Sequence, residues 1–89
     1  PLRFSGQRLE LNVQTSGGGS VAVELLDAEG TPLPGYTYAD AVPLHGDSVR
    51  MPVRWKTAGQ DVGPHAGQTI RLRFHLRDCK LYAFQFPDQ

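Results

Sequence analysis

The stretch TIRLRFHLRD, residues 69–78, decides the fold class. Its side chains alternate between an apolar phase and a polar, mostly cationic phase. The apolar phase is Ile70, Leu72, Phe74 and Leu76, and the cationic phase is Arg71, Arg73, His75 and Arg77. Because successive side chains of a β-strand point to opposite faces of the sheet, this period of two predicts a strand with one buried face. We interpret the cationic row as the outer face, with Glu10 and Glu24 as possible cross-strand partners.

The same period of two recurs along the chain. Alternating segments occupy residues 8–15, 20–27, 48–56, 69–77 and 81–86, after a short strand-like LRF near the start. Turn formers separate them, at SGGGS (16–20), DAEGTPLPG (27–35) and DCK (78–80). No window has sustained helical spacing. The pattern predicts an all-β fold, a small antiparallel β-sandwich of jelly-roll or Greek-key type, with 69–77 and 81–86 paired as a hairpin.

Size and charge bound the function. The 89 residues suffice for one hydrophobic core, so we expect a single domain over residues 1–89. The chain starts at Pro1 rather than Met, from which we expect a domain excised from a larger protein. Nine basic and nine acidic residues give zero formal charge, which argues against a nucleic-acid partner. No apolar run approaches the ~20 residues of a membrane span, so no membrane partner is expected.

No group of residues has the spacing of a catalytic or metal site. GxSxG is absent, and the single Cys79 excludes an internal disulfide and a cysteine zinc framework. The three histidines, His45, His65 and His75, lack HxH or HExxH spacing. DxDxDG spacing is also absent, although carboxylates in the loops leave calcium open as an alternative. We therefore expect no enzyme activity and no cofactor.

The loop GYTYADAVPLHGD, residues 35–47, is the candidate binding segment. It is part of a long irregular stretch, and such stretches often carry function. Aromatic faces next to carboxylate, imidazole and guanidinium groups suit a sugar, which needs stacking and hydrogen bonds. The candidate carbohydrate-binding residues are Tyr36, Tyr38, Asp40, His45, Asp47, Arg50 and Trp55. The alternatives are that the two tyrosines plug one end of the domain and that Trp55 belongs to the core.

Three ordered segments carry a family resemblance: SVAVELLDAEGTPLPGY, GDSVRMPVRWK and AGQTIRLRFHLRDCKLYAFQF. Together they cover residues 20–86. They resemble the C-terminal β-sandwich of bacterial glycoside hydrolase-like proteins, whose catalytic domain is a five-bladed propeller related to glycosidase families 32 and 43. The chain departs from that pattern at Cys79, where Ala is expected, and at Asp40-Ala41, where an acidic residue followed by Cys is expected. The resemblance implies an accessory domain, and no position matches the catalytic carboxylates of the propeller.

Two functions follow as hypotheses. The first is a non-catalytic carbohydrate-binding module whose partners are a polysaccharide or oligosaccharide and the catalytic domain of the parent chain. The alternative is a structural accessory domain that packs against the catalytic domain and binds no ligand of its own. Exposed aromatic faces along a groove would favour the first, whereas an apolar patch on one sheet with buried tyrosines and no groove would favour the second. For either function, we expect a secreted or extracytoplasmic parent protein.

Overall fold

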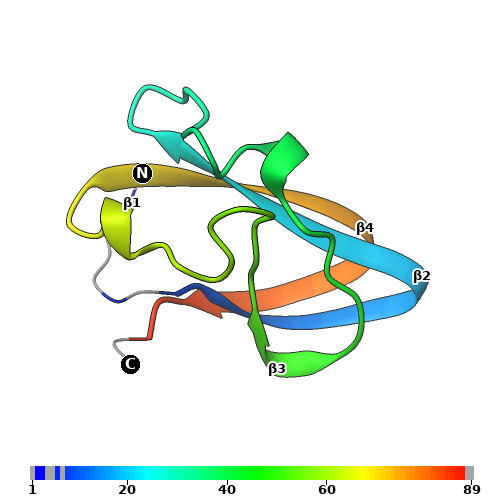
Figure 1. Ribbon diagram of the computed structural model, residues 1–89. Helices are drawn as coiled ribbons and strands as arrows, with labels where there is room; N and C mark the ends of the chain where they lie inside the picture. Colours follow the sequence, from blue (N-terminus) through cyan, green and yellow to red (C-terminus); the bar gives the residue numbers. More distant parts are fainter. Residues whose placement is uncertain (1, 4–5, 7, 88–89) are drawn as a thin grey trace.

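The computed structural model describes residues 2–3, 6 and 8–87 (Figure 1). Their elements are β1 (Leu2–Arg3), β2 (Glu10–Asp27), the 3-10 turn η1 (Tyr38–Asp40), β3 (Ser48–Pro52), the 3-10 turn η2 (Gly63–His65) and β4 (Thr69–Gln85). These residues contain no α-helix, and the all-β class is confirmed. The strands form one antiparallel sheet in the order β1-β4-β2-β3.

Two long strands, β2 and β4, pair with each other along almost their whole length. The pairing runs from Glu10 opposite Gln85 to Asp27 opposite Ile70. It is interrupted where residues 16–19 of β2 face only Asp78 of β4. Figure 1 shows that both strands turn back on themselves at this interruption, at the right of the view. The two halves of the bent ribbon thus lie on opposite sides of the core.

The interruption explains why two expected turns are absent. SGGGS does not end a strand, because β2 continues through residues 16–20. DCK does not connect a hairpin either, since β4 continues through residues 78–80 and both of its halves pair with β2. The predicted hairpin between 69–77 and 81–86 is therefore wrong. Gly18 and Asp78 have φ angles of 79° and 46°, the left-handed region, which turns both strands without ending them.

The core lies between the two halves of the ribbon. The apolar phase of β2 supplies Leu11 and Val13 from the first half and Val21, Val23 and Leu25 from the second, all fully or almost fully buried. Because a bend between two amphipathic halves turns their apolar faces toward each other, one sheet encloses the core without a second sheet. The loops between β2 and β4 complete the core with Tyr36, Ala41, Leu44, Val53, Trp55 and Val62.

Pro52 lacks a backbone N–H, which predicts an edge strand or a bulge, and it lies in an edge strand. β3 is the last strand of the sheet order and pairs only with β2 among the described strands. It ends at Pro52 rather than at residue 56, and the Val53 N–H that follows donates to the Leu9 carbonyl at 2.9 Å. Trp55 follows outside the strand, in isolated bridges with Ala41 and Gly59.

The cationic phase of β4 faces outward, as expected. Arg71, Arg73 and Arg77 are exposed, and His75 is partly exposed. Glu24 lies across from Arg73 in the register, and its carboxylate is 3.5 Å from the Arg73 guanidinium and 3.3 Å from the His75 Nε2. The expected partner Glu24 is confirmed, whereas Glu10 pairs with arginines from other segments.

Candidate functional site

Two of the candidate aromatic residues are in the core. Tyr36 is 6% exposed and Trp55 is 1% exposed, and their rings contact edge to face at a centroid distance of 5.1 Å. The Trp55 indole Nε1–H donates to the Val23 carbonyl at 2.9 Å. The Tyr36 hydroxyl donates to the Asp61 carbonyl at 2.7 Å, and burial, aided by the Asp61 charge, raises the pKa of Tyr36. Neither ring has a free face, so neither can stack on a sugar in this conformation.

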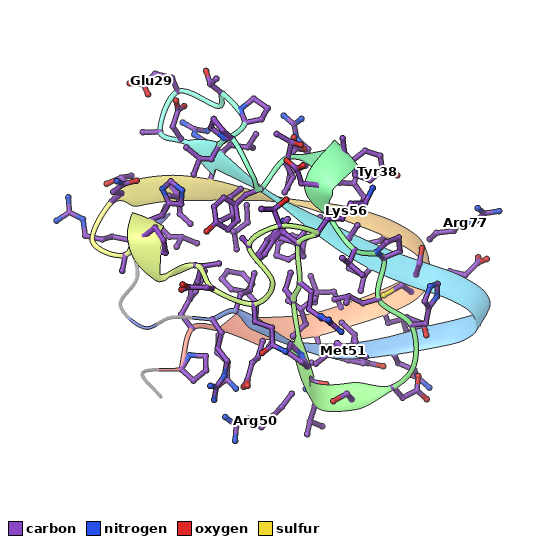
Figure 2. All side chains as sticks on the ribbon, in the orientation of Figure 1. Glu29, Tyr38, Arg50, Met51, Lys56 and Arg77 are labelled. Carbon is purple, nitrogen blue, oxygen red and sulfur yellow. The ribbon has the colours of Figure 1, made fainter. Side chains whose placement is uncertain are left out.

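Tyr38 has the opposite environment. It is 57% exposed at the start of η1, and its ring lies against the His75 imidazole with a centroid distance of 4.1 Å (Figure 2). Asp40, at the end of the same turn, is engaged locally. Its carboxylate accepts from the Thr37 hydroxyl at 2.8 Å and from the Thr37 backbone N–H, while the Thr37 side chain accepts from the Asp40 N–H. This reciprocal capping box fixes the turn.

His45 and Asp47 connect the end of the loop to the bend of β2. The His45 Nδ1 lies 2.7 Å from the Gly19 carbonyl, and the Asp47 carboxylate accepts from the Thr15 backbone N–H at 3.0 Å. The Thr15 hydroxyl also exchanges hydrogen bonds with the backbone of Gly46. These contacts satisfy backbone groups of β2 on the side away from β4, past the end of its pairing with β3 at Ser48. The His45 and Asp47 side chains therefore hold the end of the loop against β2.

Arg50 belongs to a separate polar cluster on the outer side of β2. Its Nε donates to the buried Glu10 carboxylate at 2.9 Å, and Arg8 and Gln85 donate to the same group at 3.1 and 3.2 Å. The Arg50 hydrogen bond lowers the pKa of Glu10 and outweighs burial, which raises it. This cluster joins β2, β3 and β4.

The seven candidate residues do not converge on one surface. Tyr36 and Trp55 lie in the interior, Tyr38 and Asp40 on η1, His45 and Asp47 at the bend, and Arg50 on β3. Within the described part of the chain, no three His, Cys, Asp or Glu side chains are placed to hold a metal ion. No helix among the same residues is long and apolar enough to cross a membrane. Calcium binding stays a prediction that these observations do not test.

An apolar surface on β4 is the feature that the sequence analysis missed. Leu76 and Phe84 are 47% and 42% exposed although both belong to the core-facing phase. They lie opposite buried Val21 and Leu11 in the register. Phe74, on the same face, contacts Phe84 at a centroid distance of 5.7 Å across the two halves of the ribbon. We call Leu72, Phe74, Leu76 and Phe84 the open face.

The open face lies beside β1, the shortest strand among the described residues. Within that described part of the chain, β1 pairs with β4 only at Thr69 and Ile70. A depression of about 490 Å³ lies beside β4, and its lining residues are Leu2, Leu26, Gly30, Arg71, Leu72, Arg73, Phe74 and Phe84. The alternating strand phases predict Phe4 and Phe84 in the core. For Phe84 this prediction is wrong, because it is 42% exposed and no described segment packs over that side of β4. Phe4 lies outside the described residues.

The sequence contained a partial signal for this surface. The alternating segments 69–77 and 81–86 are together much longer than the strand-like LRF at the start of the chain. Because the two segments were predicted to pair with each other as a hairpin, the sequence analysis did not predict an uncovered edge. No protein-family model, no curated protein and no solved structure matches the chain. The resemblance to the accessory tails of glycoside hydrolase-like proteins therefore stays a proposal.

Proposed function

We propose that the chain is a non-catalytic accessory domain that docks on a neighbouring protein domain through its open face. The observation that carries the proposal is the exposure of Leu76 and Phe84 beside an otherwise closed core. Apolar side chains that continue a core and remain uncovered gain free energy when a partner buries them. The partner surface would complete the core that β4 leaves open.

Burial of the aromatic residues supports docking over carbohydrate binding. Of the three aromatics considered for stacking, Tyr36 and Trp55 are buried and Tyr38 alone is exposed. Asp40, His45 and Asp47 already bond to the backbone or side chains of their own loop and of β2. A glycan bound at the candidate residues would therefore meet one exposed aromatic ring and polar groups with other partners, although Tyr82 is also 59% exposed elsewhere on the surface. The buried tyrosine and the apolar patch are the features expected of an accessory packing domain.

The family resemblance supplies a candidate for the neighbour. In the proteins that the chain resembles, a five-bladed-propeller glycoside hydrolase-like domain precedes the β-sandwich tail. We propose such a propeller as the docking partner, with the parent protein secreted or extracytoplasmic. In this arrangement the catalytic carboxylates belong to the propeller, and the chain itself contributes no catalytic group.

The test measures binding between the chain and the propeller domain of that parent protein. Isothermal titration calorimetry is run with the unaltered chain and with a Leu76→Thr, Phe84→Thr double variant, in which threonine keeps the strand propensity. We expect the double variant to bind roughly tenfold or more weakly, because it removes apolar area from the contact. The matched control is Tyr38→Thr, which changes a 57% exposed aromatic residue on η1 that is not part of the open face.

Two outcomes would overturn the proposal. One is equal binding of the propeller by the double variant and the unaltered chain. The other is binding of a glycan from a polysaccharide and oligosaccharide panel that Tyr38→Ala abolishes, since this would favour the carbohydrate-binding hypothesis. The melting temperature of each variant is measured alongside, so that loss of fold is separated from loss of binding.

A further inference from the structure

The backbone of β4 has a long edge that no other described strand pairs with. Among the described residues, pairing on this edge stops at Ile70, whereas β4 continues to Gln85. An edge strand presents a row of N–H and C=O groups that can pair with another extended chain. From Arg71 to Arg77 the edge is uninterrupted, because the bend comes only at Asp78. This half is about 20 Å long at the usual rise of a strand.

The two faces of this edge differ in chemistry. On the inner side, Leu72, Phe74 and Leu76 offer apolar contact beside the depression along β4. On the outer side, Arg71 and Arg77 are exposed. Arg71 donates to the Ala28 carbonyl at 2.9 Å, and its charge has no carboxylate partner among the described residues. A strand added here would meet apolar and cationic neighbours alternately.

Arg77 defines the outer face most clearly. Figure 2 shows its side chain extending from the right end of the ribbon, away from the other labelled residues. It makes no hydrogen bond or ion pair with the residues that the structure describes. The nearest acidic group in the register, Glu24, is buried and already shared by Arg73 and His75. Although the whole chain has zero formal charge, this edge has a local excess of positive charge.

We infer that the β4 edge from Arg71 to Arg77 binds an extended segment of a partner protein in which apolar residues alternate with Asp or Glu. The segment pairs antiparallel to β4, in line with β1. Its apolar phase covers the open face, and its acidic phase lies beside the arginines. Cross-strand pairs of opposite charge stabilise a sheet, while like charges directly opposite destabilise it.

The same charge row argues against a second copy of this chain as the occupant. Two β4 edges paired antiparallel would place arginine rows next to each other on the outer face, and the like charges would repel. An acidic strand avoids this repulsion, because its carboxylates lie beside the arginines. The same arginines disfavour partners that carry positive charge. The inference deepens the proposed function, on which it rests, by naming the chemistry of the segment that covers the open face.

The probe is a synthetic nine-residue peptide with blocked ends in which Val and Glu alternate. Its binding to the full chain is followed by ¹⁵N–¹H nuclear magnetic resonance. We expect the backbone amides from Arg71 to Arg77 to shift, and those of β3 to stay unchanged. A matched peptide with Lys in place of Glu should bind roughly tenfold or more weakly, since each charged pair contributes ~0.2–1 kcal/mol and repulsion replaces several of them.

Two controls separate strand pairing from simple charge attraction. An Arg71→Glu, Arg77→Glu double variant, which changes only exposed side chains, should prefer the lysine peptide. N-methylation of alternate peptide residues removes backbone donors. It should abolish binding when the methylated N–H groups are those that point to β4, and it should be tolerated when they are those that point away. The inference would be overturned if both methylated peptides had equal effects or if the chain showed no preference between the Glu and Lys peptides. Dimerisation of the chain alone through β4 would also overturn it.

The outcome is independent of the test of docking. If the peptide fails to bind while the propeller domain binds and the open-face variant weakens it, the inference is wrong and the proposed function stands. If neither binds, both are wrong. If the peptide binds and the propeller does not, the edge recognises a strand from another kind of partner, and the docking proposal is overturned.

Discussion

At the scale of single residues, buried polar groups hold the elements together. The Glu10 carboxylate is 6% exposed and receives donors from Arg8, Arg50 and Gln85, which belong to three different segments. Its charge is kept because these donors replace water. The Trp55 indole N–H likewise gives the buried Val23 carbonyl a hydrogen-bond donor in the core. Arg50 and Trp55, which were candidate ligand-binding residues, therefore form hydrogen bonds that stabilise the fold.

Glu10 gives a pH-dependent prediction. Its pKa in the folded state is below the ordinary 4.5, chiefly because of the Arg50 hydrogen bond, so its stabilisation is present above the unfolded pKa and is lost as pH falls through the folded pKa. Glu10→Gln should lower the free energy of unfolding by about 1 kcal/mol at neutral pH, a modest value because Arg50 is largely exposed. Urea titrations should show that this difference shrinks below about pH 4. The control Glu29→Gln, in the exposed turn seen in Figure 2, should show neither effect.

At the scale of elements, the bend between the two halves of the ribbon determines the architecture. Residues 16–19 of β2 lie opposite a single residue of β4, which makes an irregularity like a β-bulge. Gly18 adopts a φ of 79°, which residues with a Cβ rarely adopt. Asp78 adopts a φ of 46° on the partner strand, where Asp is tolerated better than most residues. The two strands thus bend at the same point without losing their pairing on either side.

The bend can be tested with neighbouring glycines. Gly18→Ala should lower the free energy of unfolding by about 1–2 kcal/mol, because an L side chain is strained at positive φ. Gly17→Ala is the matched control, since Gly17 lacks a positive φ and neither position has atoms within 4 Å of a new Cβ. Chemical denaturation of both variants measures the difference. Equal losses would show that the left-handed conformation does not determine stability at the bend.

At the scale of the whole molecule, protection is uneven across the sheet. β2 is central, and its backbone is bonded on both sides where Val21 pairs with Leu44 and Leu25 pairs with Tyr36 and Leu33. β4 has a partner on only one side beyond Ile70 among the described residues. The molecule therefore has one closed side, built by the loops, and one open side along β4.

Hydrogen exchange should report this asymmetry. The amides of Val21 and Leu25 and the Trp55 indole should exchange at the rate of global unfolding, because their bonds lie in the core. Alternate amides from Arg71 to Gln85 should exchange roughly 100-fold faster or more, since they point to an unpaired edge. Native-state exchange followed by nuclear magnetic resonance measures both sets. Uniformly slow exchange along β4 would mean that something covers the edge in solution.

Local patterns predicted the strands well and their connections poorly. The alternation at 8–15, 20–27 and 69–77 identified which side chains face the core, because the period of two is a property of the extended backbone itself. SGGGS and DCK were read as turns because their residues favour turns. Whether such residues end a strand or bend it depends on the partner strand opposite, which is far away in the sequence.

The sequence by itself determined the all-β class and the inward and outward phases of β2 and β4, and Pro52 narrowed β3 to an edge strand or a bulged one. Only the tertiary structure decided that Tyr36 and Trp55 are buried, that Tyr38 is exposed, and that β4 has an open edge. The physical reason is that phase follows from local backbone geometry. Burial and edge position depend on long-range pairing, which brings together residues from opposite ends of the chain.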